Sequence, residues 1–399
     1  MKLKLLYNFL SLCIYLNLFK FSFTLKSFYY AKILIHGMIF LDGQINCKKV
    51  SESWNEDITH QNLCNFLNHG RMDLELVSNN RINHLLPLAI ENANNQDILS
   101  DYVLFSIDPS EFKKYKNKKT QGVSYSGDGK STYKVQNMVM SSLIFGESCI
   151  PFKKILYWGK KNAPKNRLQS KIEIFSKLSR KAEKVNLLSK KKIIVFDGLG
   201  CNKSLLPKFH NKEEWVGFVT KFPRSRNIVI GENTIHIKKY LSNLTAFNFQ
   251  KDKEKDIYYH EFEASVPSLD FLGVCKFIVV IDKLSDLKNQ KTIRVLITNI
   301  MTLSSEQIRL IYFRRWKQET YHQIIKDRLG LRNYKHRKLK AVMRLLELGD
   351  LAYSYLEYQR LLNWNYSISE TRNSLIDKYA NFISNKFGLK SPKPLQKVA

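Results

Sequence analysis

The chain has 399 residues, of which 65 are Lys or Arg and 35 are Asp or Glu, so its formal net charge is +30. This length allows a sizeable core and excludes a small scaffold held together by disulfides. The six cysteines are scattered without a CxxC pair, which excludes a zinc ribbon and predicts a reducing compartment. The excess positive charge favours a polyanionic partner, nucleic acid first, although ribosome-associated and membrane-surface proteins share it.

The N-terminal region, residues 1–100, is predicted to be helical. Its first residues, MKLKLLYNFLSLCIYLNLF, have the lysines and apolar run of a secretory signal, but polar residues interrupt the run and no small-residue cleavage site follows. No other stretch is long and apolar enough to span a bilayer. Residues 41–108 carry 4 basic against 10 acidic residues. Two interpretations therefore stay open, a helix-turn-helix that binds DNA ends and a packing or dimer-forming bundle.

Residues 101–215 change to an α/β pattern. DYVLFSID, YKVQNMVMSSLIF and CIPFKKILYW predict three strands, an amphipathic helix follows over residues 168–185, and KKIIVFD predicts a buried strand. Asp108 and Asp197 each end one of these apolar runs. If those two strands lie side by side in parallel, both carboxylates emerge at the carboxyl edge of the sheet. Either Asp alone could instead cap the turn that follows it.

The rest of the chain divides into three parts. Residues 216–300 contain five strand-like stretches among polar turns and predict a β-rich insertion. Residues 301–335 begin with Ser304 and Gln307, whose spacing predicts a capping box and a helix that runs to about Leu329, with Gly330 as its stop. Residues 336–399 predict a helical C-terminal region.

That helix carries the most informative pattern, in the segment YFRRWKQETYHQIIK. Steps of three, four and seven residues place Tyr312, Arg315, Glu319 and Lys326 within about 60° of one another on a helix. A polar stripe is most often the solvated side of a helix, and Arg315 and Glu319 could form an ordinary i, i+4 ion pair.

These four residues together with the two aspartates resemble a known family. The chain is similar to the DDE transposases of bacterial insertion sequences, in the branch marked by a Tyr-x2-Arg-x3-Glu-x6-Lys signature, which it matches at every spacing. YSGDGK, FDGLG and RLGLRNYKHR also agree with the family, and the resemblance covers roughly residues 30–360. It implies an RNase H-like catalytic core with a β-rich insertion between the second and third acids.

The resemblance also implies a chemistry and its residues. Phosphoryl transfer needs charge neutralisation, which two divalent metals supply, and hard Mg²⁺, or Mn²⁺, prefers carboxylate oxygens. Asp108, Asp197 and Glu319 are therefore the expected catalytic acids and ligands of two ions. Tyr312, Arg315 and Lys326 are the expected DNA contacts. The implied protein is a cytoplasmic, nucleoid-associated transposase that acts on double-stranded DNA as a homodimer, with no membrane partner.

The chain departs from the family in one respect. Family members often stack a Trp of the insertion on a flipped base, but residues 216–315 contain none, which leaves Tyr258, Tyr259 or Phe277 as substitutes and puts hairpin-ended excision in doubt. Two rivals remain, an inactive or domesticated transposase-derived DNA-binding protein and a structure-specific nuclease that cuts without joining.

Overall fold

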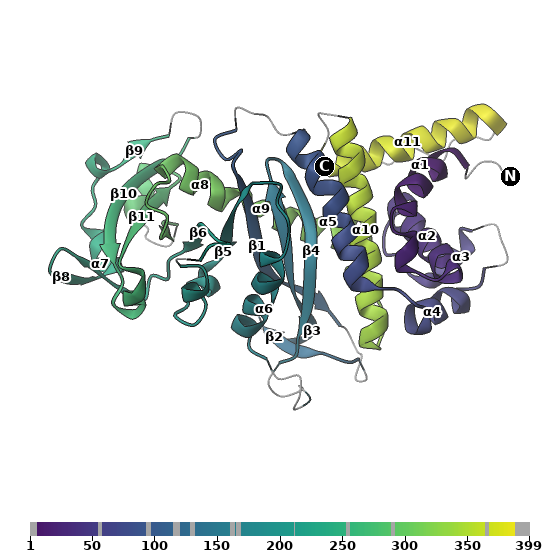
Figure 1. Cartoon of the computed structure of the whole chain (residues 1–399), viewed down its shortest axis with the longest axis horizontal. Coiled ribbons are helices and arrows are strands. Elements are labelled where there is room, and N and C mark those ends of the chain that lie inside the picture. The colour runs from purple at the N-terminus through teal and green to yellow at the C-terminus, as the bar shows by residue number, and fades with distance from the viewer. Residues whose placement is uncertain are drawn as a thin grey trace.

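The structure is a computed structural model that joins a helical layer to a long mixed sheet (Figure 1). It describes residues 6–54, 58–92, 97–114, 120–127, 132–159, 164, 169–210, 212–252, 256–288, 292–363 and 367–387. The outermost C-terminal part of the predicted helical region, from residue 388, lies outside these residues. No helix among them is long and apolar enough to cross a membrane.

The N-terminal segment folds into five helices, of which α1, α2, α4 and α5 pack against the long helix α10 (Leu339–Leu362) and α3 packs on α2 and α4. Their bounds are α1 Leu6–Asn17, α2 Leu25–Phe40, α3 Cys47–Glu52, α4 His60–His69 and α5 Leu74–Glu91. The apolar run at the N-terminus becomes α1, in which Leu12, Tyr15 and Leu16 are at most 1% exposed. In Figure 1, α1 to α4 form a separate layer on the far side of α10, and α5 lies between α10 and the sheet.

The central strands form an antiparallel meander followed by parallel strands. Along the sheet the order is β4-β3-β1-β5-β6, and β2 pairs with the N-terminal end of β3. β5 and β6 run parallel to β1, and the crossover between β4 and β5 contains α6. The bounds are β1 Tyr102–Lys113, β2 Ser124–Gly127, β3 Thr132–Phe145, β4 Ser148–Tyr157, α6 Lys171–Glu183, β5 Lys191–Phe196 and β6 Gly217–Lys221.

The strands that follow β6 continue the same sheet. From β6 the order is β12-β11-β10-β7-β8, all antiparallel, with β9 on β10. The expected start of the insertion at residue 216 is therefore not a break in the sheet. The bounds are β7 Asn227–Ile230, β8 Asn233–His236, α7 Ile237–Ser242, β9 Gln250–Lys251, β10 Tyr258–Ser265, β11 Val274–Ile281 and β12 Arg294–Thr298.

The sheet separates two hydrophobic clusters, because side chains alternate between its faces. One cluster contains Leu104 of β1 and Ile193 and Val195 of β5, together with side chains of α8 to α10 and of the N-terminal helices α1 to α4. Phe105 and Ile194 belong to the other, which α6 covers with Ile174, Phe175 and Leu178. The two faces of β1 and β5 are therefore covered by different helices.

The expected helix from Ser304 to about Leu329 is present, and its hydrogen bonding is irregular at two points while the backbone stays helical at Arg315 and Ile324. α8 (Ser305–Arg314) starts with the predicted Ser304–Gln307 capping box, and α9 (Trp316–Gln323) follows a tightened turn at Arg315. A π-helical turn, Ile324–Arg328, closes with Leu329 N–H donating to Ile324 O. The helices α10 (Leu339–Leu362) and α11 (Ile368–Phe387) complete the chain.

Candidate active site

Asp108 lies inside a strand, not at its end as expected. β1 continues to Lys113 because it stays paired with β3, where Asp108 lies opposite Met140. Its pairing with β5 stops at Ser106 and Val195, and Asp197 directly follows β5. The two aspartates thus lie where the parallel part of the sheet ends.

The register of β1 and β5 brings the two aspartates together. Leu104 pairs with Ile193 and Ser106 with Val195, so the same register carried two residues further places Asp108 opposite Asp197. Neighbouring strands are about 4.8 Å apart, and side chains two residues apart share a face. Both carboxylates therefore lie on the face of the sheet that carries Ile193 and Val195, the face that α8 and α9 cover.

Tyr312, Arg315 and Glu319 come to this face from α8 and α9. The Tyr312 hydroxyl donates a hydrogen bond to Asp197 Oδ1 at 3.3 Å. Arg315 Nη2 lies 2.7 Å from Glu319 Oε1, and the Arg315 guanidinium carbon is 5.4 Å from the centre of the Tyr312 ring. Tyr312 is 4% and Arg315 5% exposed. The alternative of a solvated stripe is therefore wrong for these two residues.

Lys326 reaches the same group from the π-helical turn. Its side chain is half-buried, and its Nζ lies 5.2 Å from the centre of the Phe112 ring of β1. Burial, and then the charge of Arg332, lower the pKa of Lys326, while Asp327, Glu111 and Asp108 oppose that shift. Lys326 is thus close enough to Asp108 for their charges to interact.

The electrostatics of Asp108 show that all five charged residues form one group. Burial raises the pKa of Asp108 to about 6, Arg315 and Lys326 lower it, and Glu319 and Asp197 raise it. Arg315 in turn has a raised pKa despite its burial, because Tyr312 and the three acids favour its charge. The structure therefore brings together every site residue that the sequence predicted.

Two residues of α9 that the sequence analysis missed lie at the site, His322 beside Asp108 and Gln318 on the neighbouring strand β3. His322 Nδ1 lies 3.7 Å from Asp108 Oδ2, and burial, with Lys326 and Arg315, lowers the pKa of His322 to about 3, so the ring is neutral. Gln318 Nε2 donates to Met140 O, opposite Asp108 in β3. The only signal for them in the sequence is that they lie within one helical turn of Glu319. The sequence does not show which of the residues around Glu319 face the sheet, so it could not distinguish these two from core residues.

The substitutes for the missing Trp are partly excluded. Phe277 is 0% exposed and packs on Phe222 and Phe262, so it cannot stack on a base. The Arg309 guanidinium covers the Tyr259 ring at 3.7 Å. Tyr258 alone of the three is neither fully buried nor covered by an arginine among the described residues.

Carboxylate oxygens are suitable ligands for a hard divalent cation, but the three acids do not surround one common point. No group of three His, Cys, Asp or Glu side chains among the described residues is arranged to hold a metal ion. The contacts give the reason, since Glu319 is paired with Arg315 and Asp197 accepts from Tyr312. Glu319 would have to leave Arg315 before all three acids could share an ion.

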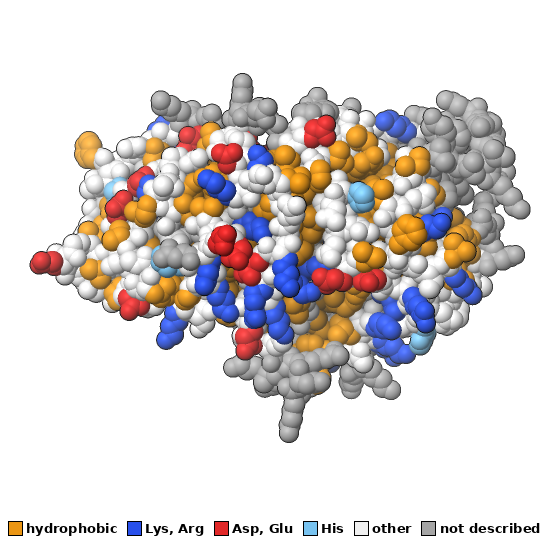
Figure 2. All heavy atoms as spheres, viewed as in Figure 1, with side chains coloured by type: hydrophobic (Ala, Val, Ile, Leu, Met, Phe, Trp, Pro, Cys, Tyr) orange, Lys and Arg blue, Asp and Glu red, His pale blue; other side chains and the backbone are white. Residues whose placement is uncertain are grey.

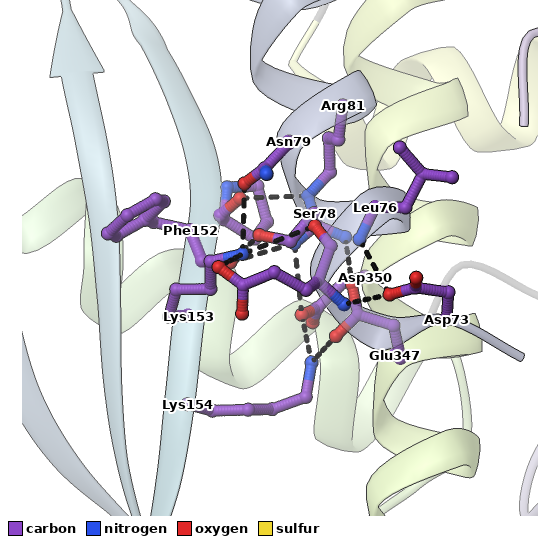
Figure 3. Close-up of polar contacts among 12 residues, drawn as sticks. Asp73, Leu76, Ser78, Asn79, Arg81, Phe152, Lys153, Lys154, Glu347 and Asp350 are labelled. Carbon is purple, nitrogen blue, oxygen red and sulfur yellow. Dashed lines mark hydrogen bonds and ion pairs between the residues drawn. The ribbon is translucent and has the colours of Figure 1, made fainter. Parts of the chain in front are cut away.

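A buried ionic network is bonded to α9 through Tyr321. The Tyr321 hydroxyl donates to Asp350 Oδ1 of α10 at 2.5 Å. Figure 3 shows the network beyond this bond, where Arg81 of α5 and Lys154 of β4 meet Glu347 and Asp350. Arg81 Nη1 and Lys154 Nζ each lie 2.7 Å from a Glu347 carboxylate oxygen. The network therefore joins the helix of Glu319 to three other elements.

Comparison with known proteins adds little to this geometry. No family model and no curated protein sequence matches the chain. Among solved structures, it is similar to the piggyBac transposase in a synaptic complex with hairpin DNA, at a TM-score of 0.49 and 11% identity over 98% of this chain and 84% of that one. A similarity of this strength carries no argument about fold or function.

Proposed function

We propose that the protein is a DNA transposase of the DDE class, which cleaves the ends of an insertion sequence and transfers them into target DNA. The observation that carries the proposal is the group formed by Asp108, Asp197 and Glu319 with Arg315 and Lys326. The meander followed by strands parallel to β1 supports an RNase H-like core. The strands beyond β6 support the β-rich insertion between the second and third acids.

Each residue then has a role. Asp108, Asp197 and Glu319 would hold two Mg²⁺ or Mn²⁺ ions, which supply charge stabilisation for phosphoryl transfer when bound. Arg315 and Lys326 would hold phosphates beside the scissile bond, and Tyr312 would contact a phosphate or stack near the DNA. Release of Glu319 from Arg315 frees one carboxylate and one guanidinium together. The ion pair is in this view a resting arrangement that phosphate and metal replace.

The duplex would continue along the segment after the π-helical turn. Five of its cations are exposed: Arg332, Lys335, Arg337, Lys338 and Lys340. Of these, Arg332 pairs with Asp327. Backbone phosphates are the natural partners of such a run, and they position a duplex without reading its sequence. The proposed homodimer on DNA and the cytoplasmic, nucleoid-associated location rest on the family resemblance alone.

The alternative of an inactive, transposase-derived DNA-binding protein is favoured by one observation, the ion pair that neutralises Glu319. Divalent ions separate the two readings. A working site should gain thermal stability from millimolar Mg²⁺ or Mn²⁺ because ligands that bind only the native state stabilise it. An inactive protein should show no such gain and no nicking.

The test is cleavage and joining of a duplex that carries the ends of the element, found from the inverted repeats flanking the coding sequence. Wild type should nick in Mg²⁺ and join the cut end to a second duplex. Asp108→Asn should bind but not nick, because it removes a metal ligand rather than a phosphate contact. Nicking by Asp108→Asn at the wild-type rate would refute the site. Nicking without joining would instead identify the nuclease.

A further inference from the structure

A second basic surface lies on α6, which covers the face of the sheet opposite the candidate site. Lys177, Arg180, Lys181 and Lys184 are all exposed, and their spacing places them on one side of the helix. The other side packs Ile174, Phe175 and Leu178 into the core. We call the four exposed residues the α6 face. Figure 2 shows basic side chains gathered over the region of α6, in the lower middle of the view.

The charges of the α6 face are largely uncompensated. Lys181 pairs with Glu75 at 3.0 Å, and Glu75 also binds Lys153. The structure gives Lys177, Arg180 and Lys184 no acidic partner among the residues it describes. Nearby, Lys208 Nζ donates to the Ser176 hydroxyl and so adds a cation beside the helix.

A groove runs beside these cations. It has a volume of about 620 Å³. Its polar lining consists of four cations, two carboxylates and three amides: Lys153, Arg180, Lys181, Lys184, Glu75, Glu183, Asn79, Asn83 and Asn186. The cations therefore outnumber the acids by two. Amides and free cations are the donors that bind phosphate oxygens. The α6 face thus combines positive charge with a hollow into which a polyanion can settle.

Duplex DNA fits this surface better than a membrane does. Lys177 and Lys184 are separated by about 10 Å along the helix axis, which corresponds to about three phosphates of one DNA strand. α6, which the structure describes throughout, exposes no large apolar side chain that could enter a lipid layer. Binding to an amphipathic-helix site on a membrane needs such side chains.

One straight duplex cannot occupy both surfaces. α6 and α9 cover opposite faces of β1, so at least a sheet and a helix of about 10 Å diameter separate the α6 face from the catalytic group. A short duplex would have to bend sharply around them to reach both, against the stiffness of DNA over a few tens of base pairs. We infer that the α6 face binds the backbone of a second duplex segment, separate from the one at the carboxylates. This inference rests on the proposed function only in taking DNA as the partner.

The experiment is a two-duplex capture with the full chain. Protein is loaded on a bead-tethered duplex, and a fluorescent duplex of unrelated sequence is then added. In the triple variant Lys177→Gln/Arg180→Gln/Lys184→Gln, binding to the first duplex should stay within about twofold, while capture of the second should fall about tenfold. The slope of log affinity against log salt for the second step should become shallower by about 2.7, or about 0.9 for each phosphate that is no longer neutralised.

The matched control is Lys20→Gln/Lys26→Gln/Lys239→Gln, which removes three exposed lysines from α2, α7 and the segment before α2. It should capture both duplexes like wild type. Unchanged capture by the α6 variant would overturn the inference, because two copies could then bridge the duplexes through their catalytic faces. Equal loss of binding to both duplexes would also overturn it. Wild-type protein that captures both duplexes but does not cleave its element's ends would count against the proposed function alone and leave this inference standing.

Discussion

The environment of Asp108 is the most informative single-residue feature, because it is unfavourable for a carboxylate without a metal. Burial raises the pKa of Asp108 to about 6 from 3.8, even though Arg315 and Lys326 oppose that shift. The folded chain therefore binds more protons than the unfolded chain between about pH 4 and 6. Stability should fall as pH rises through that window, and the ionised carboxylate costs at most about 3 kcal/mol above it.

This predicts that Asp108→Asn is more stable than wild type at pH 8 in EDTA, because it removes the buried charge, and that the difference disappears near pH 4. Urea unfolding at both pH values measures it. The control is Asp101→Asn, an exposed residue just before the same strand, which should show no such pH dependence. A variant that is equally destabilised at both pH values would show that Asp108 is not held as a costly buried anion.

The second residue-scale prediction concerns Lys326. On a solvated stripe, the ion pair of Arg315 with Glu319 would contribute under about 1 kcal/mol to stability. Because Arg315 is buried, Arg315→Ala should instead lower stability as well as activity. Lys326→Ala separates the two effects, because it is half-buried and its ammonium group is already disfavoured by burial. It should melt within about 2 °C of wild type yet lose strand transfer at least tenfold, since phosphate positioning is lost. Normal strand transfer by Lys326→Ala would remove Lys326 from the site, and Lys239→Ala is the surface control.

At the scale of elements, the irregular helix from α8 to the π-helical turn is held by contacts on both sides. Tyr321 fixes α9 to α10, and the segment after the π-helical turn is fixed to the N-terminal layer at Gly330. Gly330 has φ +68°, and Ile45 N–H donates to its carbonyl oxygen. The candidate site thus depends on elements that contribute no residue to it.

We expect Tyr321→Phe to lower the free energy of unfolding by about 2 kcal/mol, since it removes a buried hydrogen bond to a charged group. It should also reduce strand transfer, because Glu319 lies on the helix that this bond holds. Tyr355→Phe is the matched control. Tyr355 also lies on α10, but its hydroxyl forms a hydrogen bond with Ser11 of α1 and not with a residue of α9. If both variants lost activity in proportion to stability, Tyr321 would have no positioning role.

Gly330→Ala is expected to destabilise the fold by more than the strain of a left-handed residue alone, about 1–2 kcal/mol. A Cβ at Gly330 would lie 2.2 Å from the Gly43 carbonyl oxygen. Gly231→Ala is the control. Gly231 has φ +59°, and a Cβ added there would meet nothing within 4 Å, so this variant has the backbone strain without the clash. Urea unfolding of both alanine variants measures the difference. Equal costs would mean that the Gly43 loop moves aside freely.

At the scale of the whole molecule, the net charge of +30 is distributed over more than one surface. The segment after the π-helical turn carries five exposed cations near the site, and the α6 face carries four on the other side of the sheet. If both surfaces bind DNA as proposed, the protein holds two duplex segments at once. Strand transfer requires that arrangement, because a cut end must meet a target.

Affinity for a single duplex should fall steeply with salt, because binding releases counterions from the DNA. Replacing Lys335, Arg337, Lys338 and Lys340 together by Gln should make that slope shallower by about 0.9 for each phosphate that these side chains neutralise, at most about 3.6. Fluorescence anisotropy between 50 and 200 mM salt would measure both slopes. A nearly flat dependence for wild type would point to a protein or membrane partner instead.

The sequence by itself determined those features that depend on neighbouring residues. The Ser304–Gln307 capping box starts α8 as predicted, and the meander, α6 and β5 follow from apolar patterns that are local to each segment. The spacing of Tyr312, Arg315, Glu319 and Lys326 singled out the segment that reaches Asp108. Helix and strand periods are properties of short segments, so they can be read without knowing what packs against them.

Only the tertiary structure decided how these elements meet. The register of β1 and β5, set by packing and pairing across more than 80 residues, places Asp108 opposite Asp197 although Asp108 does not end its strand. The tightened turn at Arg315, the π-helical turn and the position of His322 beside Asp108 depend on the sheet beneath them. The sequence offered an exposed ion pair of Arg315 with Glu319 only as the alternative to a role in the site. The structure forms the pair, with Arg315 buried against the sheet. Burial and register are long-range properties, and local periodicity does not contain them.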